Sequence, residues 1–261
     1  IVEGEVKNLR EGEVLLLENL RFHSEEEKND PQFAKALAGL ADVYINDAFG
    51  SAHRAHASTE AVAHLLPCAA GLLMAREIEY LQKALGSPER PFVTILGGAK
   101  VSDKIKIISN LLRRTDAILI GGAMAFPFCK VKGHAIGSSK FEQGGEVLAR
   151  QVLEQAQQKG VSVGLPVDHV IAQKLEKGAA SRAVDQEIPE GWMGLDVGPK
   201  TVSEFKKILS GAKTILWNGP LGVFETPPFD RGTREIASFI AGLKATTLIG
   251  GGDTAAAIHQ F

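Results

Sequence analysis

Cysteine, tryptophan and tyrosine are scarce in this sequence of 261 residues, which has only two of each. Cys68 and Cys129 are far apart and form no C-x-x-C pair, which argues against a disulfide framework or a zinc site and predicts two buried thiols. No apolar run approaches the roughly 18 residues of a membrane helix, and the start lacks a secretion pattern. We therefore expect a cytoplasmic protein with no membrane partner.

A dominant charge is also missing, because 29 basic residues face 31 acidic ones and the formal net charge is −2. The chain therefore has no net positive charge that would attract nucleic acid, and any basic site must be confined to a small region. The hydrophobic content of 44%, the charged content of 23% and the 28 glycines indicate a globular chain rich in tight turns. Its length suits one large domain or two ordinary ones.

Two nucleotide-binding signatures are absent. The chain contains no G-x-x-x-x-G-K-[ST] loop, which excludes a P-loop nucleotidase, and it has no H-R-D or D-F-G set of protein kinases. It does contain GGGDTA, which satisfies G-x-G-x-x-A from Gly250 to Ala255 and leaves a dinucleotide-binding oxidoreductase as an alternative. That interpretation needs an acidic residue about 20 positions further on, and only six residues follow Ala255.

Strand-like runs alternate with amphipathic segments of helical length, the pattern of a parallel sheet covered by helices. Residues 14–17 and 43–46 are predicted strands, and the helix between them begins with Asp30 as its N-cap and Pro31 in its first position. A helix over residues 72–85 ends at Gly86-Ser87-Pro88, and we place the domain boundary on it.

The second part of the chain predicts a doubly wound α/β sheet of five parallel strands. The expected strands are 92–96, 117–121, 161–165, 214–217 and 246–249, and the expected helices are 101–113, 143–158, 201–209, 231–241 and a last one from residue 253. Ligands of such sheets bind beyond the carboxyl ends of the strands. Four of the loops at that edge are rich in glycine, which lets the backbone approach a ligand closely.

Lys100 and Lys104 lie at a spacing of four at the start of the helix after the first of these strands. A helix start already carries partial positive charge, so two cations there are unfavourable unless they face an anion. A polyphosphate at the sheet edge would offset both penalties, whereas Lys106 lies round the helix and is expected to be solvated. The alternative is two solvated helix lysines.

Two acidic residues occur in the later glycine-rich loops. Asp253 follows three glycines at a helix start, where it suits a helix cap, a magnesium ligand beside phosphates, or both. Glu225 ends an otherwise apolar loop and could accept hydrogen bonds from a ribose, although an exposed loop acid is equally consistent with composition.

Arg21 and Arg54 follow the two strands expected in the first part of the chain, where forked guanidinium groups suit a small carboxylate or phosphate. His53 and His56 flank Arg54 closely. No carboxylate lies at metal-ligand spacing from them, so we interpret them as loop histidines rather than metal ligands.

Eight motifs in order, spread over nearly the whole chain, resemble the phosphoglycerate kinase family: ENLRFH, NDAFGSAHRAH, ILGGAKVSDKI, IGGAMAF, LPVDHV, GWMGLDVGP, WNGPLGVFE and IGGGDT. The resemblance implies reversible phosphoryl transfer between 1,3-bisphosphoglycerate and ADP, giving 3-phosphoglycerate and ATP in glycolysis. It implies two Rossmann-like three-layer domains: an incomplete phosphoglycerate-binding domain in 1–73, a hinge helix in 74–87 and a nucleotide-binding domain in 88–261. Hinge bending near residues 72–88 is expected, and a monomer is the simplest expectation.

The resemblance also implies roles for individual residues. Arg21 and Arg54 would bind the phosphoglycerate, Lys100, Lys104 and Arg21 would serve catalysis, and Asp253 would bind Mg²⁺. The implied nucleotide contacts are Ala99, Lys100, Lys104, Gly121, Gly122, Gly194, Leu195, Asn218, Gly219, Glu225, Gly251, Gly252, Asp253 and Thr254. Of these, Gly121, Gly122, Gly194 and Leu195 are assigned to the purine, Glu225 to the ribose, and Lys104 to the transferring group. The transfer is direct, so no nucleophilic serine or cysteine is expected.

The chain departs from the family pattern at both ends. Family members open with aspartate-asparagine and HLGRP-like substrate motifs and close with a GGGAS segment, and the sequence contains none of these. We therefore expect a truncated chain that keeps nucleotide-site residues and is inactive or impaired alone; a nucleotide-binding fragment without catalysis is the main alternative. Lys140 stands where the family commonly has an apolar residue near the purine, and Pro127 and Cys129 are also unusual.

Overall fold

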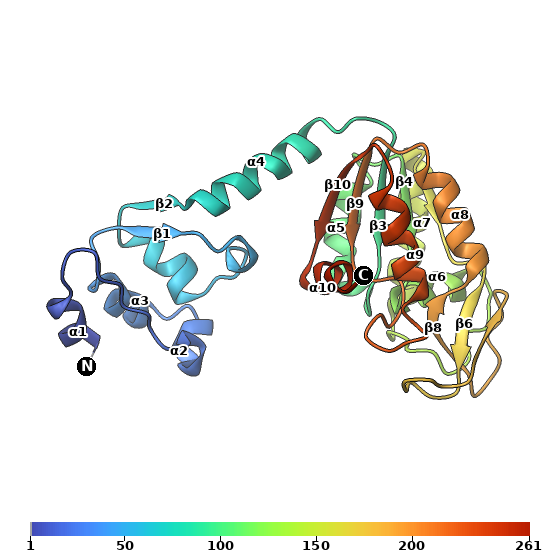
Figure 1. The fold of residues 1–261 in the computed structure, drawn as a ribbon, viewed down its shortest axis with the longest axis horizontal. Helices are drawn as coiled ribbons and strands as arrows, with labels where there is room; N and C mark the ends of the chain where they lie inside the picture. Colours follow the sequence, from blue (N-terminus) through green and yellow to red (C-terminus); the bar gives the residue numbers. More distant parts are fainter. Residues whose placement is uncertain (1) are drawn as a thin grey trace. The chain divides into compact units, whose positions relative to one another are not determined.

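The computed structural model describes residues 2–261, apart from the side chains of residues 83 and 84 (Figure 1). The chain forms two compact units, Ile1–Lys83 and Ala84–Phe261. The division falls inside helix α4 (Leu72–Gly86), which confirms the predicted helix over residues 72–85. The narrower limits 1–73, 74–87 and 88–261 stay a prediction, as does hinge bending.

Unit 1 (residues 1–83) contains α1 (Val2–Asn8), α2 (Ser24–Glu27), α3 (Pro31–Ala38), β1 (Tyr44–Asn46) and β2 (Cys68–Ala70). Single turns at Leu20–Phe22, Phe49–Ser51, Ala57–Ala61 and Val62–His64 connect them. Strands β1 and β2 pair in parallel. Helix α3 begins as predicted, because the carboxylate of Asp30 accepts hydrogen bonds from the backbone N–H groups of Gln32 (2.9 Å) and Phe33 (2.8 Å).

The strand predicted at residues 14–17 is wrong. This segment has no regular structure, and Val14 and Leu16 are 91% and 92% exposed. A strand is stable only when a neighbour pairs with its backbone, and among the described residues of unit 1 only β1 and β2 pair with each other. The prediction of two buried thiols is wrong in part, because Cys129 is buried but Cys68 lies exposed in β2.

Unit 2 (residues 84–261) is built around a parallel sheet in the order β10-β9-β3-β4-β5 (Figure 1). The strands are β3 (Phe92–Leu96), β4 (Ala117–Ile120), β5 (Ser162–Gly164), β9 (Thr214–Asn218) and β10 (Thr246–Gly250). All five strands predicted from the sequence are confirmed. Strand β3 occupies the centre, and the chain runs from it first to β4 and β5 and later to β9 and β10.

Helices cover both faces of this sheet and complete three layers. They are α5 (Ile105–Leu111), α6 (Phe126–Val131), α7 (Gly145–Lys159), α8 (Pro199–Leu209), α9 (Arg231–Ala241) and α10 (Gly252–Gln260). Single turns, Ser102–Lys104 and Ala123–Ala125, precede α5 and α6. Alternate residues of β3 point to opposite layers: Phe92 and Leu96 pack with α5 and α7, and Val93 and Ile95 pack with α8 and α9.

Unit 2 contains a second sheet that was not predicted from the sequence. Strands β6 (His169–Ala172), β7 (Ser181–Val184) and β8 (Met193–Val197) form it in the antiparallel order β7-β6-β8. These strands are short and their burial does not alternate, because β6 is nearly all buried and β7 contains no buried residue, so no strand period stands out. The sheet matters because β6 and β8 supply one wall of the pocket described next.

Candidate functional site

The amino group of Lys104 is held between the ends of β3 and β9, where the connections of the large sheet change direction. Its Nζ donates hydrogen bonds to the carbonyl oxygens of Gly97 (2.7 Å) and Asn218 (2.8 Å). Burial lowers the pKa of Lys104 to about 8, although the nearby carboxylates of Asp253 and Asp103 oppose the shift. Lys104 is therefore a fixed, partly desolvated cation at the position where doubly wound sheets bind ligands.

Two glycines make room for this amino group. Gly98 and Gly219 have φ values of +108° and +100°, which other residues rarely adopt. A Cβ at Gly219 would lie 2.6 Å from Lys104 Nζ and 2.2 Å from the Gly97 carbonyl oxygen. Position 219 therefore requires glycine for two reasons: its positive φ, and the close approach of the loop that contains it to the Gly97 carbonyl.

The start of α10 is fastened to the same strand ends. The hydroxyl of Thr254 donates to the Gly250 carbonyl (2.8 Å) and accepts from the Gly219 N–H (2.7 Å). Because its single hydroxyl proton is already donated, Thr254 can offer a phosphate only its backbone N–H. The first N–H groups of α10, which begins at Gly252 after Gly251, have no intrahelical partner, as an anion site requires.

Another helix start is already occupied by a residue that the sequence analysis did not select. The carboxylate of Glu142 accepts from the backbone N–H groups of Val101 (2.9 Å) and Ser102 (3.1 Å) and from the Ser102 hydroxyl. Burial opposes a lower pKa for Glu142, but these hydrogen bonds and nearby Lys100 outweigh it. Lys100 is exposed, and its charge lies close enough to the Glu142 carboxylate to lower the pKa of that group.

A pocket of about 370 Å³ opens beside these loops. Ala99, Asp253 and Glu225 line it together with Gly122, Gly194 and Leu195, so six of the predicted nucleotide contacts lie around one cavity. Gly121 lies next to Gly122 but is buried against Leu221, where a Cβ would meet that side chain at 2.4 Å. Asn218 and Gly219 lie below the pocket and hold Lys104 and Thr254.

The pocket has a polar end and an apolar end. Asp253, near Lys104 and the start of α10, marks the polar end, whereas Phe126, Leu175 and Met193 mark the apolar end. Glu225 is exposed and belongs to the loop after β9. This arrangement suits an elongated ligand with a flat apolar group and a polyanionic tail.

Two buried aspartates, also missed from sequence, brace the walls of the pocket. Asp196 accepts from the N–H groups of Val197 (2.9 Å) and Gly232 (2.7 Å) at the start of α9, and burial raises its pKa to about 8 with help from Asp230. Asp168 accepts from the N–H groups of Lys200 (2.9 Å) and Thr201 (2.8 Å) in the first turn of α8. Their partners are more than 30 residues away, except for Val197, so local patterns give no signal for them.

The two predicted arginines of unit 1, Arg21 and Arg54, have side chains that are less firmly held by neighbouring residues than that of Lys104. Arg21 is exposed in the turn Leu20–Phe22, whose N-cap Asn19 accepts from the Arg21 N–H at 3.1 Å. Because residues 14–17 form no strand, Arg21 does not follow a strand end as predicted. Arg54 is exposed in the turn region after β1. Neither guanidinium group makes a hydrogen bond or ion pair with the described residues.

The described part of the chain, residues 2–261, contains neither a cluster of metal-ligand side chains nor a membrane-spanning helix. No cluster of three or more His, Cys, Asp or Glu side chains lies in this part of the chain. Asp253 beside a polyphosphate still fits Mg²⁺, which binds proteins through one or two carboxylates and substrate phosphates. No helix among the described residues combines the length and the apolar character needed to span a bilayer.

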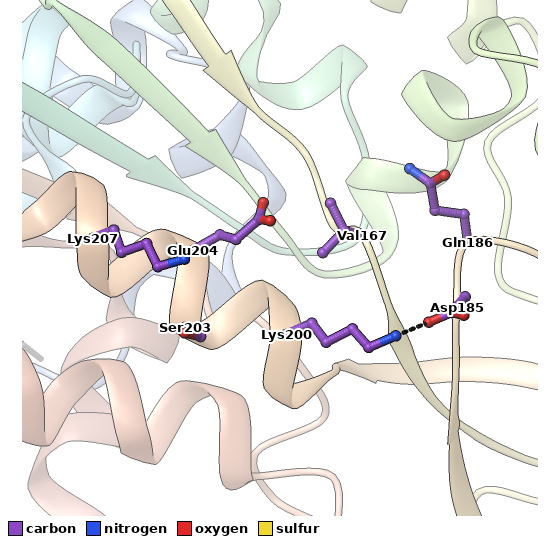
Figure 2. A pocket seen from close by; sticks show the side chains of 7 residues that line it. All are labelled: Val167, Asp185, Gln186, Lys200, Ser203, Glu204 and Lys207. Atoms are coloured by element: carbon purple, nitrogen blue, oxygen red, sulfur yellow. Dashed lines mark hydrogen bonds and ion pairs between the residues drawn. The ribbon is translucent and has the colours of Figure 1, made fainter.

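A larger hollow of about 570 Å³ lies over the first turns of α8, away from the glycine loops (Figure 2). Figure 2 shows Lys200 of α8 paired with Asp185, while Glu204 and Lys207 lie further along the helix. Lys200 and Asp185 are 66% and 75% exposed, so this pair stabilises the fold little. The hollow contains none of the predicted site residues.

Fold and site together define a doubly wound α/β protein with a glycine-lined pocket and a fixed lysine at the carboxyl ends of its parallel strands. Comparison with known proteins gives the family: the family model described as Phosphoglycerate kinase matches residues 1–261, and the chain belongs to the phosphoglycerate kinase family. This membership removes the dinucleotide-binding oxidoreductase alternative.

The relatives agree with this assignment. The phosphoglycerate kinase of Thermosipho africanus is 56% identical over the whole chain, and that of Moorella thermoacetica is 55% identical. The chain spans 66% of the length of each of these proteins. The phosphoglycerate kinase structure from Coxiella burnetii matches 95% of the chain with a TM-score of 0.83 and 41% identity, and the chain covers 65% of it. That from Pyrococcus horikoshii matches 99% with a TM-score of 0.82 and 32% identity, and 67% of it is covered.

Proposed function

We propose that the chain takes part in reversible phosphoryl transfer between 1,3-bisphosphoglycerate and ADP, which gives 3-phosphoglycerate and ATP in glycolysis. The family membership supports this reaction, and the position of Lys104 carries the proposal. An ammonium group held by two carbonyl oxygens at the strand ends cannot relax into solvent. It is therefore preorganised to attract a phosphate tail.

Each part of the nucleotide has matching residues in unit 2. Gly122, Gly194 and Leu195 line the pocket where the purine would lie, and Glu225 lines it where the ribose would lie. Lys100 and Lys104, with the backbone N–H groups of Gly251, Gly252 and Thr254, would hold the phosphates. Asp253 would hold Mg²⁺, which supplies further neutralisation of phosphate charge when bound.

Transfer of the phosphoryl group requires positioning and charge neutralisation rather than a covalent intermediate on the protein. Lys104 would stabilise the negative charge that is spread over the moving group. Arg21 and Arg54 would bind the carboxylate and phosphate of the phosphoglycerate through forked, charge-assisted hydrogen bonds. A cytoplasmic location and a monomeric state, with no nucleic acid partner, complete the proposal.

Two measurements on the 261-residue chain test this function separately. Calorimetry with Mg²⁺ and ADP reports nucleotide binding, and a coupled assay reports ADP formation from ATP that depends on 3-phosphoglycerate. Binding with turnover supports the kinase reaction, whereas binding without turnover supports a nucleotide-binding fragment. If neither ADP nor ATP binds, the assignment of the pocket in unit 2 is wrong.

A further inference from the structure

The apolar end of the nucleotide pocket contains two polar side chains that the proposed function does not use. Lys140 and His169 line this end together with Phe126, Leu175 and Met193. Polar groups among the apolar residues of a ligand pocket usually set the orientation and the specificity of the ligand.

Lys140 belongs to the base end of the pocket rather than to its phosphate end. The preceding residue, Ser139, is buried and accepts a hydrogen bond through its Oγ from the Gly194 N–H at 2.9 Å. The Ser138 N–H donates to the Trp192 carbonyl at 2.8 Å. These bonds fasten the segment to the beginning of β8.

The ammonium group of Lys140 makes no hydrogen bond or ion pair with any residue in the described part of the chain. Lys130, whose Nζ lies 4.3 Å from the centre of the Phe141 ring, differs because it pairs with Glu146 at 2.9 Å. Lys140 is also exposed, so its donors remain available. A lysine can only donate hydrogen bonds.

His169 begins β6 and is 3% exposed. Its ring lies 5.6 Å from the ring of Phe126, and burial lowers its pKa to about 4, so the imidazole is neutral at physiological pH. Its ring makes no side-chain hydrogen bond among residues 2–261, and no fully buried side-chain nitrogen or oxygen there lacks a partner, so the ring nitrogens reach the surface of the cavity that His169 lines. A neutral imidazole carries one donor and one acceptor, and its tautomer can adapt to either type of partner.

The purines differ in what they present to such groups. Guanine presents two adjacent acceptors, O6 and N7, whereas adenine presents the N7 acceptor beside the N6 amino donor. Hypoxanthine shares O6 and N7 with guanine but lacks its 2-amino group. A lysine donor matches the 6-oxopurines and meets a competing donor on adenine, whereas a neutral histidine accommodates both.

We propose that Lys140 sets base specificity by donating to O6 and N7, so that the pocket binds guanosine and inosine diphosphates at least as tightly as adenosine diphosphate. This inference rests on the proposed nucleotide site. It concerns only the base, so the phosphate contacts of Lys104 and the start of α10 are the same for all three ligands.

Calorimetry of the 261-residue chain with the Mg²⁺ complexes of ADP, GDP and IDP tests the proposal. Lys140→Met keeps the aliphatic stem and removes the donors, and Lys159→Met is the matched control at the far end of α7. We expect Lys140→Met to weaken GDP and IDP binding by about tenfold, the usual size of a charged hydrogen bond, and to leave ADP binding within about twofold. Lys159→Met should change none of the three affinities. Equal behaviour of IDP and GDP would locate the contact at O6 and N7.

The outcomes that overturn the proposal are distinct from failure of the proposed function. If the wild-type chain binds none of the three nucleotides, the site itself is wrong, and the inference falls with it. If the nucleotides bind and Lys140→Met weakens all three equally or none of them, only the base-specificity role is wrong. His169→Phe preserves the packing on Phe126, and we expect it to leave the GDP to ADP ratio unchanged; a ratio that depended on His169 instead would overturn the assignment to Lys140.

Discussion

The two units of the chain bury very different amounts of apolar surface. Among the described residues of unit 1, only Ala34, Ala57, Val62 and Met74 are buried hydrophobic residues, whereas unit 2 buries both faces of strands β3 and β4 and most of β9, including Trp217 at 0% exposure. Burial of apolar surface is the main favourable term in folding. The comparison shows where the chain can hold a charged group in place.

The candidate site follows the same division. Lys104 in unit 2 is fixed by carbonyl oxygens from two strand ends, and its surroundings shift its pKa. Arg21 in unit 1 is exposed, with no side-chain partner among the described residues. A cation fixed before the ligand arrives loses little entropy on binding, whereas an exposed arginine must still be ordered. Nucleotide binding should therefore depend on unit 2 alone.

The largest expected effect is a difference in stability between matched leucine substitutions. Leu119→Ala removes a fully buried side chain of β4 and should lower the free energy of unfolding by about 3 kcal/mol. Leu16→Ala changes a side chain that is 92% exposed and should cost less than about 0.5 kcal/mol. Urea denaturation followed by circular dichroism measures both. Equal losses would show that unit 1 depends on packing at Leu16 that the structure does not contain.

A second comparison uses two lysines of the same helix region. Lys104→Met should weaken binding of the Mg²⁺ complex of ADP by about 10-fold to 100-fold, because a charge-assisted hydrogen bond to phosphate is lost. Lys106→Met is the control, since Lys106 is exposed and lies round the helix. Calorimetry reports both affinities. If both variants lost a similar amount of affinity for ADP, Lys104 would contribute only general electrostatic attraction and no specific contact with phosphate.

Asp196→Asn should destabilise unit 2 by about 2 kcal/mol at pH 5, because the amide nitrogen cannot accept one of the two backbone hydrogen bonds. The pKa of Asp196 is about 8 in the folded chain and 3.8 in the reference state, so the folded state holds an extra proton between these values. Stability from this group is therefore lost as the pH rises from about 4 to 8. The deficit of the variant should shrink over that range in denaturation experiments; a constant deficit would contradict the raised pKa.

The smallest effect concerns the pH dependence of nucleotide affinity. Lys104 must be charged to bind phosphate, and its pKa in the ligand-free chain is about 8. Affinity for ADP should thus be insensitive to this group below pH 8 and should fall above it, approaching tenfold per pH unit. Calorimetry from pH 7.5 to 9.5 measures the slope, and Lys104→Met should abolish it. A wild-type affinity that stays constant to pH 9.5 would rule out Lys104 as the titrating contact.

Sequence patterns predicted unit 2 better than unit 1 for a physical reason. Strands such as β3 and β4 are buried on both faces, and their apolar runs identify them without knowledge of their neighbours. The run at residues 14–17 looks similar, but pairing depends on a partner strand that local sequence does not specify. An apolar run alone therefore predicts a strand reliably only where the rest of the sheet is also present.

The candidate site was predicted in the same uneven way. Glycine-rich loops after strands of the large sheet pointed to Lys104, Asp253 and Glu225 as candidates, because the position of such loops follows from the fold class. Glu142 and Asp196 escaped notice because they act on backbone N–H groups 40 and 36 residues away. Lys140 and His169 are far apart in the sequence, and only the structure shows that both line the same cavity.

Hydrogen–deuterium exchange of the 261-residue chain, with and without the Mg²⁺ complex of ADP, tests the central claim most directly. The account predicts that ADP slows exchange in residues 97–104, 194–196, 218–225 and 250–255 and leaves unit 1 unchanged. Protection that appeared in residues 19–23 and 46–54 instead, or in neither unit at saturating ADP, would contradict a preorganised nucleotide site at the strand ends of unit 2.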